Sequence, residues 1–264
     1  MLFYRLAGHI WVEDGDDEAL EVGQHNADAV QVFRGMRVCN EDMDRLEPGE
    51  KLNDELINLF LAVLAEASWE RDGPNAYCFS SNLLIVLLGE RHQGVSMNQC
   101  LLRKKAAEGS NNPPRWPKGT VTDKFVRFWE FDLIFIPLHW VANDHWTLLV
   151  LDYGCRRWLH LDPMNSLIPT TRCRHAKGML ERFLVKRAKA QGITISFDGW
   201  GYVEGDACVP PQGLNDCGVW VLIMAWLLVW QKPFDFQAKH GDILRERIRK
   251  VVLELTVGEP IVWV

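Results

Sequence analysis

Apolar side chains recur at helical spacing in several stretches of the chain, and these stretches predict its helices. The clearest one follows Asn53, a favourable N-cap, because Asp54 and Glu55 then stand in the first turn and one apolar stripe continues to about Ala67. The stripe consists of Leu56, Leu59, Phe60, Val63 and Leu64. The longest apolar run, residues 219–230, is typical of a buried helix. The predicted helices span about residues 53–67, 79–88, 171–191, 219–230 and 242–255.

Short apolar or alternating runs predict strands between these helices. The run that begins at Phe131 should end at Pro137, because proline cannot donate to a sheet ladder. The turn-forming residues Tyr153 to Arg156 separate two further runs and predict a hairpin. The predicted strands span about residues 30–33, 36–38, 131–137, 145–152, 157–162 and 193–197.

The predicted hairpin brings a histidine and a carboxylate together at its open end. If the chain turns about Tyr153 and Gly154, opposed residues have numbers that sum to about 307, which places His145 beside Asp162. His139 would need a partner near residue 168, beyond the strand, so it is the weaker candidate. A His–Asp pair at a hairpin end also arises by chance, so the pair alone does not establish a catalytic role.

A cysteine at the start of the most apolar helix is the candidate nucleophile. Cys217 lies where a turn-rich loop meets this helix, and the first amides of a helix favour negative charge nearby. A thiol in that position ionises more easily, and the thiolate is the reactive form. Gln212 lies five residues upstream, where its amide could donate a hydrogen bond to an oxyanion. Buried free cysteines are common in cores, so a base and an acid elsewhere must decide the role.

Composition narrows the class of protein without naming it. The chain has 264 residues, of which 48% are hydrophobic and 24% charged, as in ordinary globular domains. Its net charge of −6 argues against a nucleic-acid binder. The seven cysteines show no regular spacing and no CxxC, which argues against a disulfide framework or a structural zinc and favours a reducing compartment. No secretory signal is recognisable, and the longest apolar run is too short to span a bilayer.

We expect one catalytic domain over residues 30–264, preceded by an extension or flap over residues 1–29. The first segment contains the acidic patch at residues 13–18, which is unlike the patterned chain that follows. The basic helix at residues 171–191 is more typical of a solvated face than of a binding patch.

His145, Asp162, Gln212 and Cys217 together supply a base, an orienting acid, an oxyanion donor and a thiol, which are the parts that nucleophilic acyl chemistry needs. Their order and local sequence resemble the SUMO-specific, ubiquitin-like-protein-specific cysteine proteases, over about residues 30–255. The matching words, in chain order, are Leu52-Asn53-Asp54, Ile136-Pro137, His145-Trp146, Asp162, Gln212 and Asp216-Cys217-Gly218.

The resemblance implies a fold, a chemistry and a substrate. It implies an α+β, papain-like cysteine protease fold, with a short mixed central sheet flanked by helices and a permuted catalytic order. It implies that the enzyme cleaves after the Gly-Gly end of a ubiquitin-like modifier, with SUMO ahead of ubiquitin or another modifier. No cofactor or metal is implied. The expected partners are the modifier and its conjugates, without nucleic acid or membrane.

The resemblance also implies roles for single residues. His145 would be the general base, Asp162 the orienting acid, Cys217 the nucleophile and Gln212 the oxyanion donor. Substrate-binding positions would be Trp146, Asn53, Asp54 and Lys51, with Trp146 lining a narrow channel for the Gly-Gly tail. The chain departs from the family where Lys51 replaces a frequent Trp and Pro163 replaces the Ser after the acid.

Two alternatives remain open at this point. An effector-type acetyltransferase of the same clan would use the same Cys–His–acid site and would need a basic activator site, for which residues 172–189 are the local candidate. A catalytically inactive modifier-binding module is disfavoured because all four chemical positions are filled. We expect a monomer in the nucleus or cytoplasm, or in a host cell if the chain is a delivered effector.

Overall fold

A computed structural model describes residues 31–33, 36–69, 72–87, 127–164, 168–204, 215–235, 237 and 239–257. The expected extension over residues 1–29 and the candidate oxyanion donor Gln212 lie outside this part of the chain. The strands are β1 (Gln31–Phe33), β2 (Met36–Val38), β3 (Ala76–Cys78), β4 (Leu133–Trp140), β5 (His145–Asp152), β6 (Arg157–Leu161) and β7 (Gly201–Glu204). The α-helices are α1 (Asn40–Asp44), α2 (Asp54–Ser68), α3 (Asn82–Leu87), α4 (Thr170–Lys189), α5 (Cys217–Val229) and α6 (Lys239–Val257). Short 3₁₀ helices are η1 (Phe128–Glu130) and η2 (Val141–Asn143).

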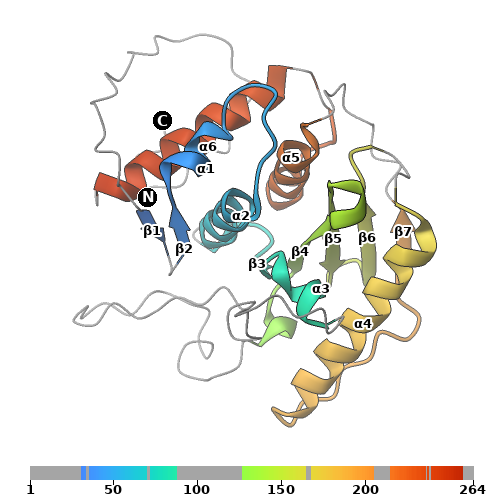
Figure 1. Ribbon diagram of the computed structural model, residues 1–264. Helices are drawn as coiled ribbons and strands as arrows, with labels where there is room; N and C mark the ends of the chain where they lie inside the picture. The colour runs from blue at the N-terminus through green and yellow to red at the C-terminus, as the bar shows by residue number, and fades with distance from the viewer. Residues whose placement is uncertain are drawn as a thin grey trace, which may run out of the picture.

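The central sheet is mixed and has the strand order β3-β4-β5-β6-β7 (Figure 1). Strands β4, β5 and β6 form an antiparallel meander, while β3 and β7 pair in parallel at the two edges. Strands β1 and β2 form a separate antiparallel hairpin, as the alternation at residues 30–38 predicts. A short mixed sheet flanked by helices is the α+β architecture expected from the sequence.

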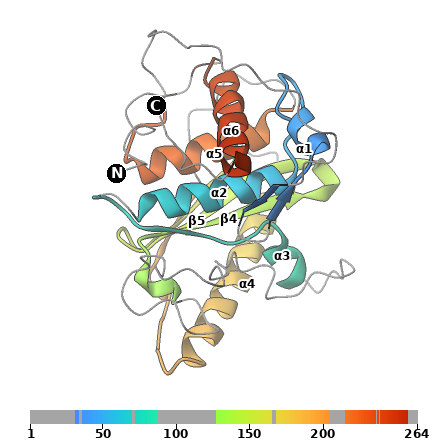
Figure 2. The ribbon, with the colours of Figure 1, turned by 90° about the vertical axis from the view of Figure 1, so that its left-hand side faces the viewer.

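Helices cover both faces of the sheet and divide the interior into two cores. Strand β5 shows the division, because Leu148 and Val150 belong to the core under α2, α5 and α6, while Leu149 and Leu151 belong to the core under α3 and α4. Successive side chains of a strand point to opposite faces, so a strand buried on both sides is a continuous apolar run. Figure 2 shows α2, α5 and α6 on one side of β4 and β5, with α4 on the other.

Local signals define the two helices that flank the site. The Asn53 side chain accepts the Leu56 amide at 3.2 Å and caps α2, as predicted. Helix α5 is apolar on all sides and buries nearly every position, which places it between the sheet and the outer helix α6. It ends where Gln231 takes a left-handed conformation, with φ 52°, and the Lys232 amide closes onto the Leu227 carbonyl at 2.9 Å.

Four elements differ from what the sequence patterns predict or were not predicted at all. Strand β4 passes through Pro137 and ends at Trp140, because β3 covers only the first part of β4 and leaves the proline on an edge, where its missing N–H costs nothing. Residues 76–78 form the edge strand β3, for which the sequence patterns predicted no element. Residues 193–197 form no strand; the edge is instead supplied by β7, while Phe197 packs on Trp158.

The fourth difference concerns a helix start. Helix α6 begins at Lys239, so Asp242 stands in its first turn instead of capping it. A carboxylate is favourable at either place because of the helix dipole, which explains why the sequence pattern did not separate them.

Candidate active site

The structure brings His145 and Asp162 together through the end of the β5–β6 hairpin. The four-residue turn pairs Asp152 with Arg157 and Leu148 with Leu161, so opposed residues sum to 309 and not to the expected 307. His145 and Asp162 are therefore diagonal neighbours, which long side chains still bridge. His145 Nε2 lies 2.7 Å from Asp162 Oδ1, and both side chains are buried.

Cys217 lies beside the His145–Asp162 pair, although it is far from both residues in the sequence. It is the first residue of α5, which packs on β5, and its side chain lies close enough to that of His145 to raise the pKa of the imidazole. Because His145 Nε2 is bonded to Asp162, the ring presents Nδ1 to the thiol. Cys217 is 2% exposed, so its side chain is almost fully covered. The order acid, imidazole, thiol is the arrangement of a nucleophilic triad.

The charges of the pair support each other in spite of their burial. Burial lowers the pKa of His145, but the hydrogen bond to the Asp162 carboxylate, its negative charge and the proximity of Cys217 outweigh that effect and raise the pKa to about 9. Burial likewise opposes ionisation of Asp162, yet bonds from His145 and from the Met164 amide, at 2.9 Å, hold the pKa of this carboxyl below its ordinary value. The arrangement therefore favours an imidazolium beside a carboxylate.

Trp146 forms a flat wall beside the nucleophile. Its ring stacks on His139, with centroids 4.5 Å apart, and its Nε1 donates to the Leu52 carbonyl at 3.2 Å. A Cβ on Gly218 would come within 3.1 to 3.4 Å of Ile57, Leu52 and Trp146. Only glycine therefore lets the residue after Cys217 approach this wall closely, which gives the Asp-Cys-Gly sequence a steric reason.

The side chain of Lys51, near this wall, is held by an ion pair. Its ammonium forms an ion pair with Asp144, whose other oxygen lies 3.4 Å from His139 Nε2. Asp144 takes a left-handed conformation, with φ 46°, in the turn just before His145. The bond from Lys51 keeps the pKa of Asp144 below its usual value. The frequent Trp of the family is thus replaced by a polar bridge to the neighbouring turn.

The other two candidate binding residues have local structural contacts. Asn53 caps α2 with its oxygen and donates to Asp42 Oδ1 at 2.5 Å with its nitrogen, so both ends of its amide are engaged. Asp54 hydrogen-bonds Glu55, and this bond is the main reason why the pKa of Glu55 rises to about 8. Direct contact of Asn53 or Asp54 with a substrate stays a prediction.

Within the described ranges, no three His, Cys, Asp or Glu side chains gather in a way that could hold a metal ion. None of the described helices is long and apolar enough to cross a bilayer. The sequence pattern missed the contribution of His139, which stacks under Trp146, and that of Asp144. Their only sequence signal is proximity to His145, which does not reveal the bond to Lys51.

A buried thiol beside an imidazole, which a carboxylate holds, is the arrangement expected of a cysteine nucleophile on an α+β scaffold. Residues 50–257 match the model of the Ulp1 protease family, C-terminal catalytic domain. The chain belongs to this family.

Curated relatives and solved structures agree with the match. Sentrin-specific protease 2 of Mus musculus is 24% identical over 216 residues, which are 81% of this chain and 32% of that protein. Sentrin-specific protease 5 of Mus musculus is 24% identical over 218 residues, 81% of this chain and 24% of that protein. The chain therefore spans a third or less of these relatives.

Two solved structures share the fold. The yeast Ulp1 protease domain in complex with Smt3, the yeast ortholog of SUMO, gives a TM-score of 0.62 at 20% identity, covering 89% of this chain and 90% of that one. The Ulp1-like SUMO protease catalytic domain of Chaetomium thermophilum gives 0.60 at 22% identity, covering 87% and 84%. These matches confirm the fold class expected from the sequence.

Proposed function

We propose that this chain is a cysteine protease that cleaves after the C-terminal Gly-Gly of a ubiquitin-like modifier, either from lysine side chains or from a precursor. The observation that carries the proposal is the contact chain from Asp162 to His145 to Cys217 in a member of the Ulp1 protease family. The effector-type acetyltransferase is not favoured, because the family that the chain matches and the relatives it resembles are proteases.

The geometry supports a two-step acyl transfer. His145 takes the thiol proton of Cys217, and the thiolate attacks the carbonyl carbon of the terminal glycine. The imidazolium then gives its proton to the departing lysine amine, which leaves the modifier as a thioester on Cys217. Water attacks the thioester with His145 as base and releases a carboxylate and the free thiol. Asp162 holds the ring in the productive orientation and stabilises its charged form.

The oxyanion of each tetrahedral intermediate needs donors. The first amides of α5 have no partner within the helix, so they are available to donate hydrogen bonds to an oxyanion formed beside Cys217. Gln212 would add its side-chain amide. This role rests on the sequence position of Gln212 alone.

Selectivity for a glycine tail follows from the burial of the nucleophile. Cys217 is almost fully covered, and Trp146 and Gly218 pack together at its side. A tail with side chains would have to displace this rigid aromatic wall, whereas Gly-Gly needs only the width of a backbone. Lys51 and Asp144 would lie at the entrance to this passage.

SUMO is the modifier we propose. The relatives are named sentrin-specific proteases, and the Ulp1 domain that shares the fold was solved with Smt3, the yeast ortholog of SUMO. We further propose that residues 30–264 form one catalytic domain that acts as a monomer on these conjugates. The cysteines that the structure describes are all free, which suits a reducing nuclear or cytoplasmic compartment.

A panel of tail-reactive probes tests the proposal. Folded protein is incubated with equal amounts of SUMO and ubiquitin probes that carry an electrophile at the C-terminus, and with labelled acetyl-CoA. We expect an adduct with SUMO at the highest rate and no stable acetyl label. Absence of an adduct with any modifier would overturn deconjugation, and acetyl label on Cys217 would support the acetyltransferase instead.

A further inference from the structure

Helix α6 carries a buried arginine whose charge has no obvious role in a core. Arg245 is 2% exposed, although its neighbours Leu244 and Ile248 on the same face are the apolar residues that pack on α5. A buried guanidinium costs several kcal/mol unless its donors find acceptors. Its contacts therefore decide why the position is charged.

The guanidinium joins two segments that are far apart in the sequence. Nη1 donates to the Arg45 carbonyl at 3.0 Å, and Nη2 donates to the Glu50 carbonyl at 2.6 Å and to Asp216 Oδ1 at 2.8 Å. A second bond, from Asn215 Nδ2 to the Gly49 carbonyl at 2.7 Å, ties the same two segments together. The planar fork of arginine suits this geometry because it fixes several acceptors at once.

Each of these segments leads directly into the active site. Asp216 precedes Cys217, and its carbonyl accepts the Trp220 amide in the first turn of α5. Its carboxylate does not cap α5 and is bound by Arg245 instead. Glu50 leads through Lys51 to Leu52, whose carbonyl holds the Trp146 ring. One side chain thus links the nucleophile and the wall of the proposed channel.

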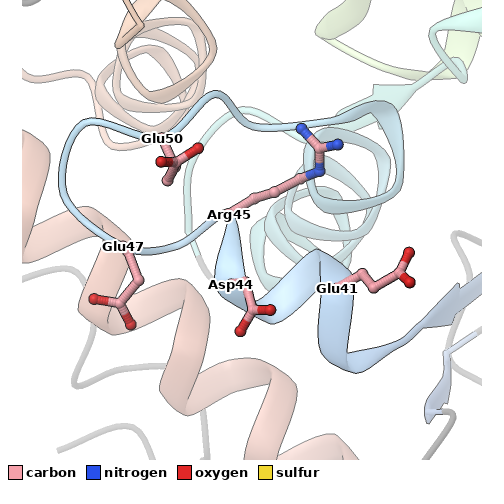
Figure 3. A pocket seen from close by; sticks show the side chains of 5 residues that line it. All are labelled: Glu41, Asp44, Arg45, Glu47 and Glu50. Atoms are coloured by element: carbon pink, nitrogen blue, oxygen red, sulfur yellow. The ribbon is translucent and has the colours of Figure 1, made fainter.

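The outer side of the loop at residues 45–50, together with the neighbouring helix α1, is open and acidic. A hollow of about 430 Å³ lies there, lined by Glu41, Asp44, Arg45, Glu47 and Glu50 (Figure 3). None of the candidate catalytic residues lines it. The loop therefore borders solvent, while Arg245 binds the backbone carbonyls of Arg45 and Glu50.

We propose that Arg245 is a positioning residue, which fixes the start of α5 and the loop at residues 45–50 relative to each other so that Cys217 meets both His145 and the tail. This role rests on the proposed function, because its effect on turnover is measured with a modifier conjugate as the substrate. Arg245 itself touches neither the substrate nor the reacting atoms.

The same helix offers a matched control. Arg249 lies one turn after Arg245 and binds the same loop through Glu47 Oε1 at 2.8 Å. That pair is at the surface, with Glu47 62% exposed. Such surface pairs contribute little to stability, so Arg249→Met removes a similar charge without loosening the start of α5.

The test compares Arg245→Met, Arg245→Lys and Arg249→Met. For each folded variant, kcat and KM are measured on a SUMO–fluorophore conjugate. The alkylation rates of Cys217 and of the exposed Cys155 by iodoacetamide are followed peptide by peptide. For Arg245→Met we expect kcat to fall on the order of 10²-fold, as for displaced catalytic groups, with a smaller change in KM. Alkylation of Cys217 should slow, that of Cys155 should not, and Arg249→Met should match the wild type.

Arg245→Lys keeps the charge but loses the fork, so it should show an intermediate loss of kcat. If Arg245→Met does not fold, the kcat and the Cys217 alkylation rate of Arg245→Lys test the proposal instead. A folded Arg245 variant with the kcat and Cys217 alkylation rate of the Arg249→Met control would overturn the proposal. So would failure of both Arg245 variants to fold, which would assign the residue to folding alone. Alkylation needs no modifier, so these outcomes remain distinct from a failure of the proposed function.

Discussion

The described part of the chain contains two buried cysteine–histidine pairs, whose cysteines belong to different cores, and the pairs differ in chemistry. Cys217 and His145 meet where α5 begins, while Cys173, in the first turns of α4, lies with its Sγ 3.4 Å from His160 Nε2. All four side chains are nearly inaccessible, and both cysteines lie near the start of a helix. Neither burial nor position in a helix therefore explains why the two pairs differ in chemistry.

The bond to the Asp162 carboxylate distinguishes the His145–Cys217 pair from the His160–Cys173 pair. Asp162 is hydrogen-bonded to His145, and the pKa of that ring rises to about 9. Asp162 acts on His160 only through space, so burial prevails and lowers the pKa of His160. Burial is also the main reason why the pKa of Cys173 rises to about 12. The second pair is held neutral, and a neutral thiol is a poor nucleophile.

The comparison teaches that proximity of a thiol and an imidazole is not enough for nucleophilic chemistry. A carboxylate bonded to the far nitrogen of the ring makes its charged form stable inside the protein. The pair without that bond serves as an internal control for the pair with it.

The largest expected effect comes from exchanging the cysteines one at a time. Cys217→Ala should abolish hydrolysis of a SUMO–fluorophore conjugate, because no other described thiol lies beside a charged imidazole. Cys173→Ala should keep most of the activity, since it removes only a small buried side chain at a cost of about 1 kcal/mol of stability. Activity that survives Cys217→Ala, or disappears with Cys173→Ala in a folded chain, would contradict the assignment.

The next effect concerns the acid. Asp162→Asn should lower turnover by several orders of magnitude, on the order of 10⁴-fold by analogy with serine triads, while modifier affinity and fold are kept. His160→Gln is the matched control, because it alters the other ring near Asp162 and should leave most of the turnover. If Asp162→Asn weakens modifier binding as much as turnover, the role of Asp162 is structural.

Removal of the aromatic wall should have a strong effect as well. Trp146→Ala should greatly lower turnover, because the side of the channel next to Gly218 is lost, and it should cost about 3–5 kcal/mol of stability as a large buried truncation. Trp146→Phe keeps a flat wall but loses the bond to the Leu52 carbonyl, and it should retain more activity. Both are assayed at a temperature where they are folded. Wild-type turnover in Trp146→Ala would refute the channel.

The two histidines predict opposite pH effects. Since the pKa of His145 is raised from 6.5 to about 9, the stability it contributes is complete below pH 6.5 and is lost as the pH rises through 9. The pKa of His160 is lowered, so its neutral form contributes stability that is lost as the pH falls below 6.5.

Thermal unfolding of the wild type, Asp162→Asn and His160→Gln from pH 5 to pH 10 measures both effects. The benefit of Asp162 over Asn should shrink towards pH 9, and turnover should fall there as the imidazolium is lost. A benefit of Asp162 that grows between pH 7 and pH 10 would contradict a raised pKa of His145.

The smallest effect is expected at Lys51. Its ion pair with Asp144 is exposed, with side chains 37% and 62% accessible, so its loss should cost about 0–1 kcal/mol. Lys51→Trp should therefore be tolerated, and a second flat wall should lower KM for a Gly-Gly-ended modifier or leave it unchanged. Asp144→Asn, which breaks the same pair without adding a wall, is the control. A large rise in KM for Lys51→Trp alone would mean that the polar bridge itself admits the tail.

Sequence patterns predicted the parts of the site that depend on local signals. Asn53 is a cap, Cys217 opens an apolar helix, and the turn before Arg157 makes a hairpin, all of which can be read within a few residues. The hairpin register was misjudged by two because the turn is centred between Gly154 and Cys155, and the diagonal contact of His145 with Asp162 compensated for this.

Contacts between distant segments could not be predicted in the same way. Lys51 and Asp144 are 93 residues apart, and Arg245 is one of several basic residues on an amphipathic helix. Only packing distinguishes it from its neighbours. The edge strand β7 was likewise missed, because its place depends on β6 and not on its own alternation.

The most direct test of the central claim asks which sulfur attacks the tail. Wild-type protein is reacted with a SUMO probe that carries a C-terminal electrophile, and the cross-linked peptide is identified by mass spectrometry after digestion. The account predicts a single adduct on Cys217, which Cys217→Ala removes and Cys173→Ala leaves in place. An adduct on Cys173, or none from folded protein, would contradict it.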